Sequence, residues 1–242
     1  MRKTSIIIPT YNGKELLKDC IYSIKRYTEQ PHEIIVVDNG SSDGTGDICR
    51  QEGVTFISLA NNVGFPAACN KGLKIATGDT LLLLNNDVIV SRNWLGNMLD
   101  CLYSSSEIGI VGPLTNYASG KQQVDMPYSN VEEMEQRLNE PDARKWVQVD
   151  RIVGLCFLFK RELMDRIGLL DERFSPGHYE DDDYCYRARQ AGYTFKIAGD
   201  VFVFHHGSAS FGKQDVGKLK RLIERNRQKF MEKWGVDPTI YV

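Results

Sequence analysis

Three short apolar segments of this sequence end in polar residues of the kinds that bind ligands. Taken alone, each group is typical of a turn or a helix cap. The groups become informative together if the segments are neighbouring strands that end at one edge of a sheet. An aromatic face, carboxylates and amides would then suit a nucleotide base and its ribose. The groups are Thr10-Tyr11-Asn12, Asp38-Asn39 and Asn85-Asn86-Asp87.

No backbone motif for phosphate binding accompanies these groups. The sequence has no GxGxxG after its first apolar segment and no GxxxxGK[ST] anywhere, which disfavours dinucleotide oxidoreductases and P-loop NTPases. A pyrophosphate would need another means of neutralisation, most simply a divalent cation such as Mn2+ or Mg2+. Asp87, which follows four leucines and two asparagines, is the obvious anchor for that cation. A plain turn at the end of a strand is the alternative interpretation.

A run of four carboxylates, from Glu180 to Asp183, is the second signal for chemistry. Adjacent carboxylates repel one another, so the run needs a cation or a helix N-terminus to offset the repulsion. Successive helix residues are about 100° apart, so some of the four can face a cleft while others cap the helix. A carboxylate in a cleft can act as a general base toward a hydroxyl. His205, after a later apolar segment, is either a metal ligand or a plain polar terminus.

The elements that would position these residues follow an α/β pattern. Short apolar runs predict strands and apolar residues at helical spacing predict helices. Their alternation predicts a largely parallel sheet covered by helices on both faces. We expect strands over residues 5–8, 33–37, 54–57, 80–84, 152–159, 195–198 and 201–204. We expect helices over residues 15–27, 45–52, 67–76, 131–138, 163–167, 181–191 and 213–234.

Composition narrows the class of protein. The 242 residues, 42% hydrophobic and 26% charged, suit an ordinary globular domain. A net charge of -2 argues against a nucleic-acid partner. The six cysteines form no CxxC pair, no signal peptide is visible, and no segment has the roughly 18 apolar residues of a membrane span. These features predict a cytoplasmic protein. The basic stretch from Lys213 to Lys233 is either a solvated helix face or a surface for the inner face of the cell membrane or a partner, including a second copy.

In this order the motifs resemble family 2 glycosyltransferases of GT-A fold. The resemblance covers about residues 4–210, and the ordered combination is highly specific although each motif alone is not. It implies a Rossmann-like, mostly parallel sheet in one domain over residues 1–242. Residues 1–90 would bind the nucleotide, 91–212 the acceptor, and 213–242 would form a C-terminal helix. The matching segments are 6–13, 36–45, 62–65 with Asn70 and Gly72, 84–87, 152–156 and 179–187.

The resemblance also implies an activity. Such an enzyme transfers a hexose from a UDP- or dTDP-linked sugar to a hydroxyl of a glycan, lipid-linked or protein acceptor. The transfer inverts the anomeric carbon in one in-line displacement. The setting implied is the synthesis of a bacterial surface polysaccharide or glycoconjugate.

Roles for individual residues follow from the same resemblance. Thr10, Tyr11 and Asp38 would hold the base and ribose, with Asp38 accepting from the pyrimidine N–H. Asp181 would deprotonate the acceptor and Glu180 would place it. Asp87, with His205 completing the site, would hold Mn2+ or Mg2+. The full set of substrate-binding positions would be Pro9, Thr10, Tyr11, Asp38, Asn39, Asn70, Asn85, Asn86 and Gly154.

Two positions depart from the family pattern. Asn85 stands where the first acid of the DxD motif is usual, which removes a charge and predicts weaker metal affinity. Cys69 stands where many relatives have Arg, which favours the branch that includes rhamnosyltransferases. Asp182 and Asp183 also leave the identity of the base open by one or two residues.

Two rival functions remain at this point. A nucleotidyltransferase that makes activated sugars shares the sheet, but it would need a basic, glycine-rich loop that residues 9–13 do not provide. A non-catalytic protein that binds sugar nucleotides or glycans is the alternative that Asn85 favours.

Overall fold

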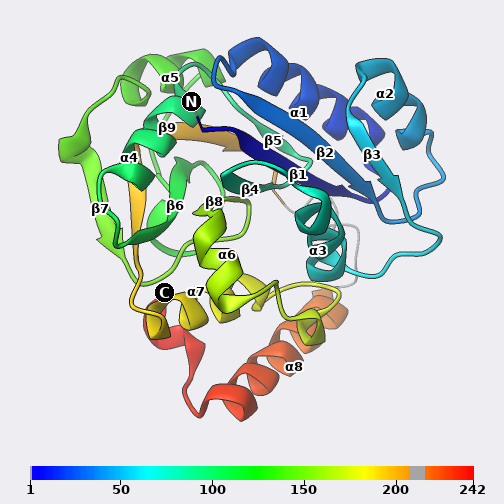
Figure 1. Ribbon diagram of the computed structural model, residues 1–242, viewed down its shortest axis with the longest axis vertical. Coiled ribbons are helices and arrows are strands. Elements are labelled where there is room, and N and C mark those ends of the chain that lie inside the picture. The colour runs from blue at the N-terminus through cyan, green and yellow to red at the C-terminus, as the bar shows by residue number, and fades with distance from the viewer. Residues whose placement is uncertain (1, 208–215) are drawn as a thin grey trace.

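The computed structural model describes residues 2–207 and 216–242, which are built around one nine-stranded mixed sheet (Figure 1). The strands are β1 (Thr4–Thr10), β2 (His32–Asp38), β3 (Thr55–Ser58), β4 (Thr80–Leu84), β5 (Val88–Ile89), β6 (Ile108–Thr115), β7 (Trp146–Val149), β8 (Cys156–Lys160) and β9 (Thr194–His205). Their order is β3-β2-β1-β4-β8-β6-β9-β5, and β7 also pairs with β9.

Helices cover both faces of this sheet. The α-helices are α1 (Lys14–Tyr27), α2 (Thr45–Glu52), α3 (Phe65–Ile75), α4 (Trp94–Tyr103), α5 (Val131–Leu138), α6 (Arg161–Ile167), α7 (Glu180–Gln190) and α8 (Val216–Trp234). Four short 3-10 helices are η1 (Gly120–Gln122), η2 (Ala143–Lys145), η3 (Glu172–Phe174) and η4 (Pro238–Tyr241). No helix among the described residues is long and apolar enough to span a membrane.

The first half of the chain confirms the predicted parallel sheet. β1 pairs in parallel with β2 and β4, and β2 pairs in parallel with β3. Side chains alternate across β1, so Ile6 and Ile8 pack on one face while Ile7 packs on the other. The polar residues that follow β1, β2 and β4 are therefore brought to the same edge, as the sequence predicts.

The second half differs from the prediction in its strands. β8 pairs antiparallel with β4 and β6, so the sheet is mixed rather than parallel throughout. The segment predicted over 152–159 begins as a strand only at Cys156, and the two strands predicted over 195–204 are one continuous strand, β9. α4, β6 and β7 were not predicted. Since β4 and β8 are hydrogen-bonded, both halves of the chain share one sheet.

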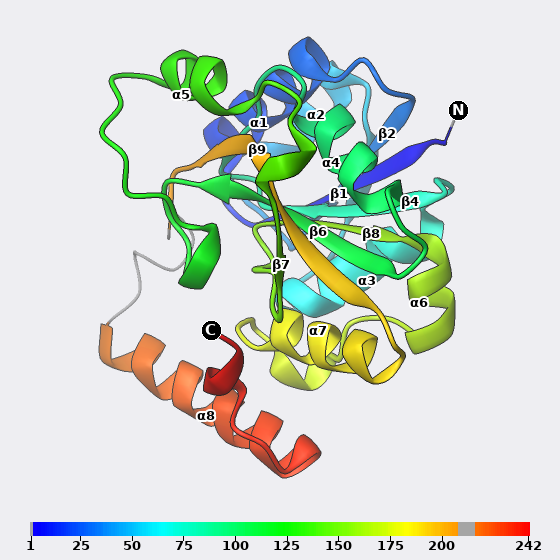
Figure 2. The same cartoon turned by 90° about the vertical axis from the view of Figure 1, so that its left-hand side faces the viewer.

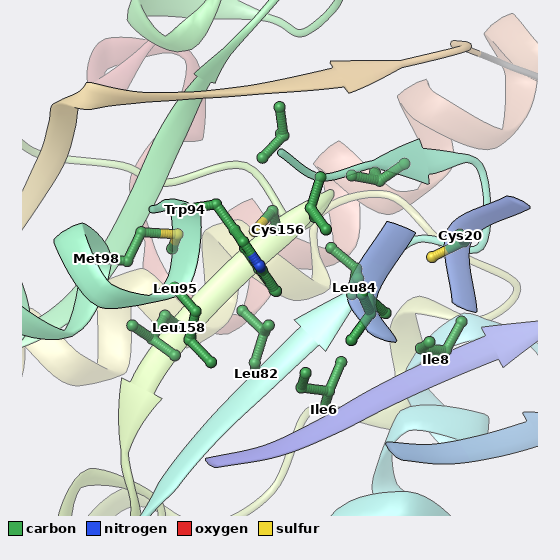
Figure 3. Packing of buried hydrophobic residues seen from close by; sticks show 14 of the residues in the cluster. Ile6, Ile8, Cys20, Leu82, Leu84, Trp94, Leu95, Met98, Cys156 and Leu158 are labelled. Atoms are coloured by element: carbon green, nitrogen blue, oxygen red, sulfur yellow. The ribbon is translucent and has the colours of Figure 1, made fainter. Parts of the chain in front are cut away.

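Two apolar layers hold the helices to the sheet. The first lies between β1, β4 and β8 and helices α1 and α4, with Trp94 at its centre (Figure 3). The Trp94 indole N–H is satisfied by Thr28 Oγ1 at 3.0 Å, so its burial leaves no polar atom unpaired. The second layer lies on the other face, under α3, α6 and α7. All six cysteines are buried and free, as expected for reduced thiols.

One close approach explains a glycine of the sequence motifs. A Cβ on Gly72 would lie 2.5 Å from Ile7 Cγ2 and 3.2 Å from Val37 Cγ2. Glycine therefore lets α3 lie directly on β1 and β2. This packing fixes the N-terminus of α3 near the ends of both strands.

α8 lies apart from the sheet and packs under α7 (Figures 1 and 2). The contact is aromatic, with the Tyr186 ring 5.7 Å from Phe230 and 4.6 Å from Trp234. The basic C-terminal helix is therefore tied to the helix that begins with the four carboxylates.

Candidate functional site

A cleft of about 760 Å³ opens where the strand ends face the N-terminus of α7. Eleven of the thirteen residues predicted for the site line it, although they come from six separate segments. These residues are Pro9, Thr10, Tyr11, Asn39, Asn85, Asn86, Asp87, Gly154, Glu180, Asp181 and His205. Leu219 and Ile223 of α8 form part of the opposite wall.

The strand ends are cross-linked at the floor of the cleft. Asn86 Nδ2 donates to Thr10 Oγ1 at 2.9 Å, and the Asn39 backbone N–H donates to Thr10 O at 2.8 Å. Tyr11 next to them is 44% exposed, so its ring is available to a ligand. These contacts give the floor a fixed shape with one aromatic face.

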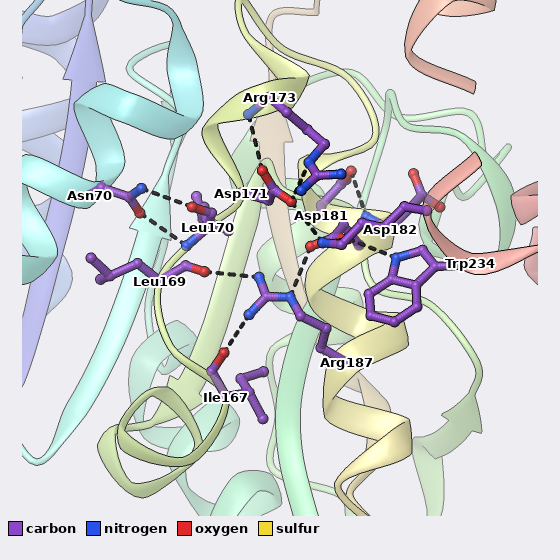
Figure 4. Close-up of polar contacts among 12 residues, drawn as sticks. Asn70, Ile167, Leu169, Leu170, Asp171, Arg173, Asp181, Asp182, Arg187 and Trp234 are labelled. Atoms are coloured by element: carbon purple, nitrogen blue, oxygen red, sulfur yellow. Dashed lines mark hydrogen bonds and ion pairs between the residues drawn. The ribbon is translucent and has the colours of Figure 1, made fainter. Parts of the chain in front are cut away.

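Two predicted site residues do not line the cleft. Asp38 is buried and its Oδ1 accepts from the backbone N–H and the hydroxyl of Ser41. Asn70 is buried in α3, where its amide donates to Leu170 O at 2.9 Å and accepts from Leu170 N at 3.0 Å (Figure 4). Asn70 also donates to Glu172. Its place in the motif is thus explained by holding the segment before η3, rather than by contact with a ligand in the cleft.

Asp87 and His205 are paired by a short piece of sheet. Val88 of β5 lies opposite His205 of β9, and this register sets the two side chains against one another. Asp87 Oδ1 lies 3.2 Å from His205 Nε2, and both side chains are buried. Burial lowers the pKa of His205, but the hydrogen bond and charge of Asp87, together with the hydrogen bond to the Tyr117 backbone, raise it above its usual value.

The chemistry of this pair fits a divalent cation. His205 Nδ1 lies 2.8 Å from Tyr117 O, so that nitrogen carries a proton and Nε2 is the one that can bind a metal. One carboxylate and one imidazole suit a cation whose other ligands are water and phosphate oxygens. Among residues 2–207 and 216–242, no group of three or more acidic, His or Cys side chains is placed to hold a metal.

The opposite wall begins with a turn of unusual backbone. His178 and Tyr179 have φ of 71° and 74°, left-handed values that are costly for side chains other than glycine. α7 starts directly after them, so its first carboxylates point into the cleft. Glu180 is buried and its Oε2 has no hydrogen-bond partner among the described residues. Desolvation, with the charge of Asp181, raises the pKa of Glu180 well above its usual value.

Arg151 holds the third carboxylate of the run. Its Nε lies 2.6 Å from Asp182 Oδ1, and Nη1 donates to Ser119 Oγ at 3.0 Å. Burial and the charge of Asp181 raise the pKa of Asp182 to about 7, although Arg151 acts in the opposite direction. Arg151 also lines the cleft, although it is not among the site residues predicted from the sequence. The only feature of the sequence that could have identified it is its position, three residues before Gly154 of the family motif.

Asp183 faces away from the cleft and is fully buried. Its Oδ1 accepts from Lys233 Nζ at 2.6 Å and Trp234 Nε1 at 2.8 Å, and its Oδ2 accepts from Arg187 Nε at 2.8 Å. Arg187 in turn donates to the carbonyls of Ile167 and Leu169 (Figure 4). Asp183 therefore joins α7 to α8 and is removed from the candidates for a base.

Asp181 is the carboxylate of the run that is held in place by hydrogen bonds and is still accessible from the cleft. Its Oδ2 accepts from Gly154 N–H at 2.8 Å, and its Oδ1 accepts from Asp182 N–H at 3.0 Å. A Cβ on Gly154 would lie 3.4 Å from Asp181 Cβ, which shows how closely the two segments approach. Two backbone donors fix the carboxylate without neutralising it, as a general base requires.

The burial of Glu180 predicts how the free energy of unfolding depends on pH. Its folded pKa is raised, so the stability it contributes is full below the unfolded pKa of about 4.5 and declines as pH rises toward the folded pKa. Replacing Glu180 with Gln should leave unfolding unchanged at pH 4. At pH 8 it should stabilise the fold, because the variant has no buried carboxyl group whose ionisation favours the unfolded chain.

Urea unfolding at both pH values measures this effect. Glu132, an exposed residue of α5, provides the control, since Glu132→Gln should not change the pH dependence. A Glu180→Gln variant that is less stable than the original protein at pH 8 would show that the ionised side chain has a stabilising partner.

The chain is similar to known glycosyltransferases in sequence. Residues 5–168 match the model of Glycosyl transferase family 2. The glycosyltransferase AglE of Haloferax volcanii is 26% identical, over 83% of this chain and 66% of its own. The N-acetylglucosaminyl-diphospho-decaprenol L-rhamnosyltransferase of Mycobacterium tuberculosis is 25% identical, over 88% of this chain and 79% of its own.

Solved structures share the fold. The mannosyltransferase PcManGT of Pyrobaculum calidifontis, solved with GDP-Man and Mn2+, superposes with a TM-score of 0.65 at 22% identity. It is matched over 84% of this chain and 56% of its own. The likeness shows a GT-A arrangement of sheet and helices. The chain spans 27% to 66% of the length of four curated relatives, AglE among them.

Proposed function

Because the chain belongs to glycosyl transferase family 2, we propose that it transfers a hexose from a nucleotide-diphosphate sugar to an acceptor hydroxyl with inversion. The donor is a UDP- or dTDP-linked sugar held at the strand ends, and the acceptor lies toward α7. A glycan, a lipid-linked sugar or a protein of a bacterial surface pathway would supply the hydroxyl. The similarity to a rhamnosyltransferase and to AglE supports this class of reaction.

The observation that carries the proposal is the state of the four carboxylates. Burial raises the pKa of Glu180, Arg151 pairs with Asp182, and Lys233 and Arg187 pair with Asp183. In the part of the chain that the structure describes, Asp181 alone is left without an ion pair or strong burial. It faces the same cleft as Thr10, Tyr11 and Asp87. A single unpaired carboxylate, facing the strand ends that would bind the nucleotide, suits a reaction in which one base assists one displacement at the anomeric carbon.

The proposed transfer is a single displacement at the anomeric carbon. The acceptor oxygen forms a bond to the anomeric carbon while the bond from that carbon to the diphosphate oxygen breaks. Asp181 takes the hydroxyl proton, and the electron pair leaves with the nucleoside diphosphate. Because attack and departure are in line, the anomeric carbon inverts and no covalent sugar–enzyme intermediate forms.

Asp87 and His205 would hold Mn2+ or Mg2+ on the side of the departing diphosphate. Such a cation supplies charge neutralisation to the leaving group. Asn85 Nδ2 lies 3.5 Å from His205 Nε2, so an amide stands beside the pair where a second carboxylate would add charge. The Mn2+ in the PcManGT structure supports a divalent cation here.

The compartment follows from the cysteines rather than from the cleft. Six buried free thiols suit a reducing environment. We therefore place the reaction in the cytoplasm, where nucleotide sugars would be the donors.

A donor panel tests the proposal directly. The protein is incubated with UDP-, dTDP- and GDP-linked sugars, Mn2+ and simple glycan or lipid-linked acceptors, and the free nucleoside diphosphate and the product anomer are measured. An inverted product from one donor class is the expected result. A retained anomer contradicts the mechanism. Binding of a donor by calorimetry with neither hydrolysis nor transfer would favour a non-catalytic sugar-nucleotide-binding protein.

Asp87→Ala provides the prediction for the cation. Loss of the carboxylate should raise the Mn2+ concentration needed for half-maximal transfer by about tenfold or more, comparable to the loss of a supporting metal contact. A Mn2+ titration of transfer rate measures it. The control is Asp47→Ala, a change in an exposed helical residue. An unchanged Mn2+ requirement in Asp87→Ala would remove Asp87 from the metal site.

A further inference from the structure

α8 presents a line of cations to the loop that leads into α7. Arg225, Lys229 and Lys233 are four residues apart, so their side chains lie on one face of the helix. Arg225 Nη2 donates to Ser175 O at 3.0 Å, and Lys229 Nζ donates to Arg173 O. Lys233 Nζ reaches Asp171 and Asp183. These three cations therefore contact the protein itself, from residue 171 to the start of α7.

Asn226 adds a buried amide beside this line. Its side chain is fully buried, and Nδ2 lies 2.6 Å from Phe174 O, 2.9 Å from Gly177 O and 3.1 Å from His178 O. Three carbonyls of one loop thus converge on a single NH2 group. Two of them belong to residues immediately before Tyr179, at the left-handed turn.

The same loop is held from the other side by α3. Phe65 N–H donates to Pro176 O at 2.9 Å, and a Cβ on Gly64 would lie 2.8 Å from Pro176 Cα. The loop is thus wedged between α8 and the N-terminus of α3. Its residues 176–179 line the cleft, whereas Asn226 and the three cations do not.

We propose that Asn226 and the line of Arg225, Lys229 and Lys233 are positioning residues for the acceptor side of the reaction. Asn226 holds the left-handed turn at His178 and Tyr179, and the three cations hold the chain on either side of it. This turn sets the direction in which α7 presents Asp181. Without these donors the turn relaxes, because two left-handed non-glycine residues have lower-energy conformations available. This inference rests on the proposed function of Asp181 but assigns a role to α8 beyond it.

Asn226→Asp tests the role of the amide hydrogen bonds, because it removes the NH2 donor with little change in the size of the side chain. The carboxylate provides no N–H donor and repels the three carbonyls. We expect kcat/KM for the acceptor to fall on the order of 10²-fold, as a displacement of about 1 Å can cause. The donor KM should stay within about twofold, since the floor of the cleft is untouched. Hydrogen exchange should become faster at Gly177 N–H, which donates to Phe174 O, and remain unchanged in β1.

Arg225→Met is a second variant that tests the same positioning role if Asn226→Asp folds poorly. Arg225 is exposed, so its replacement spares the core, and a smaller loss in the same direction is expected. The matched control is Arg221→Met, one turn earlier, where the described residues supply no hydrogen bond or ion pair. Arg221→Met should behave like the original protein.

The outcomes separate the inference from the proposed function. Acceptor-selective loss with faster exchange in the loop supports the positioning role. Unchanged kinetics and exchange in both variants, or equal losses for donor and acceptor, overturn it. If the original protein transfers no sugar from any donor, the proposed function fails. Exchange at Gly177 N–H then still decides whether Asn226 holds the turn.

Discussion

Asp181→Asn is expected to lower the transfer rate by about 10²- to 10⁴-fold, the usual cost of losing a general base. The amide oxygen of the replacement can still accept from Gly154 N–H, so the local geometry should survive. Donor affinity and the thermal unfolding midpoint should change little. Steady-state kinetics with the donor found in the panel, together with calorimetry of the nucleoside diphosphate, measure these quantities.

Asp182→Asn is the informative partner of that variant. Asp182 is paired with Arg151, so we do not assign it the proton transfer. A smaller loss than in Asp181→Asn is expected. If Asp182→Asn loses more activity, or if Asp181→Asn retains full turnover, the base has been assigned to the wrong carboxylate.

Asp183→Ala is expected to destabilise the fold by about 3–5 kcal/mol, the usual cost of removing one partner from a buried ion pair. The substitution removes the acceptor that the Lys233 ammonium, the Arg187 guanidinium and the Trp234 indole N–H share. Because α8 is attached to α7 through these donors, α8 should be affected first. Urea unfolding followed by circular dichroism and by tryptophan fluorescence measures the change.

Glu162→Ala is the control for this stability measurement. Glu162 lies 3.9 Å from Lys160 and its side chain is 63% exposed, so its loss should cost less than about 1 kcal/mol. Lys160 keeps its hydrogen bonds to the carbonyls of Ser105 and Ser106. A loss in Asp183→Ala no larger than this control would show that the buried network contributes little.

The order of the motifs determined the fold class and the family of this protein. Apolar runs such as residues 80–84 are short and bounded by polar residues, so their pattern alone predicts buried strands. The strands of the antiparallel half are harder to predict from the sequence. β9 spans twelve residues through Gly199 and Asp200, where the apolar pattern is interrupted. Asp200 is buried there because Trp146 Nε1 and Asp142 N–H donate to it, which no local pattern reveals.

The sequence by itself determined which residues could do chemistry, because a ligand-binding strand end or a run of carboxylates is a local feature. Only the tertiary structure decided how four adjacent carboxylates differ. Arg151, Gly154 and Lys233 come from distant parts of the chain, and each acts on a different member of the run. The ionisation of a carboxylate depends on its burial and on its neighbours in space, and a local stretch of sequence specifies neither. For the same reason only the tertiary structure shows that the side chains of Asn70 and Asp183 bond to other parts of the chain, Asn70 to Leu170 and Asp183 to Lys233 and Trp234.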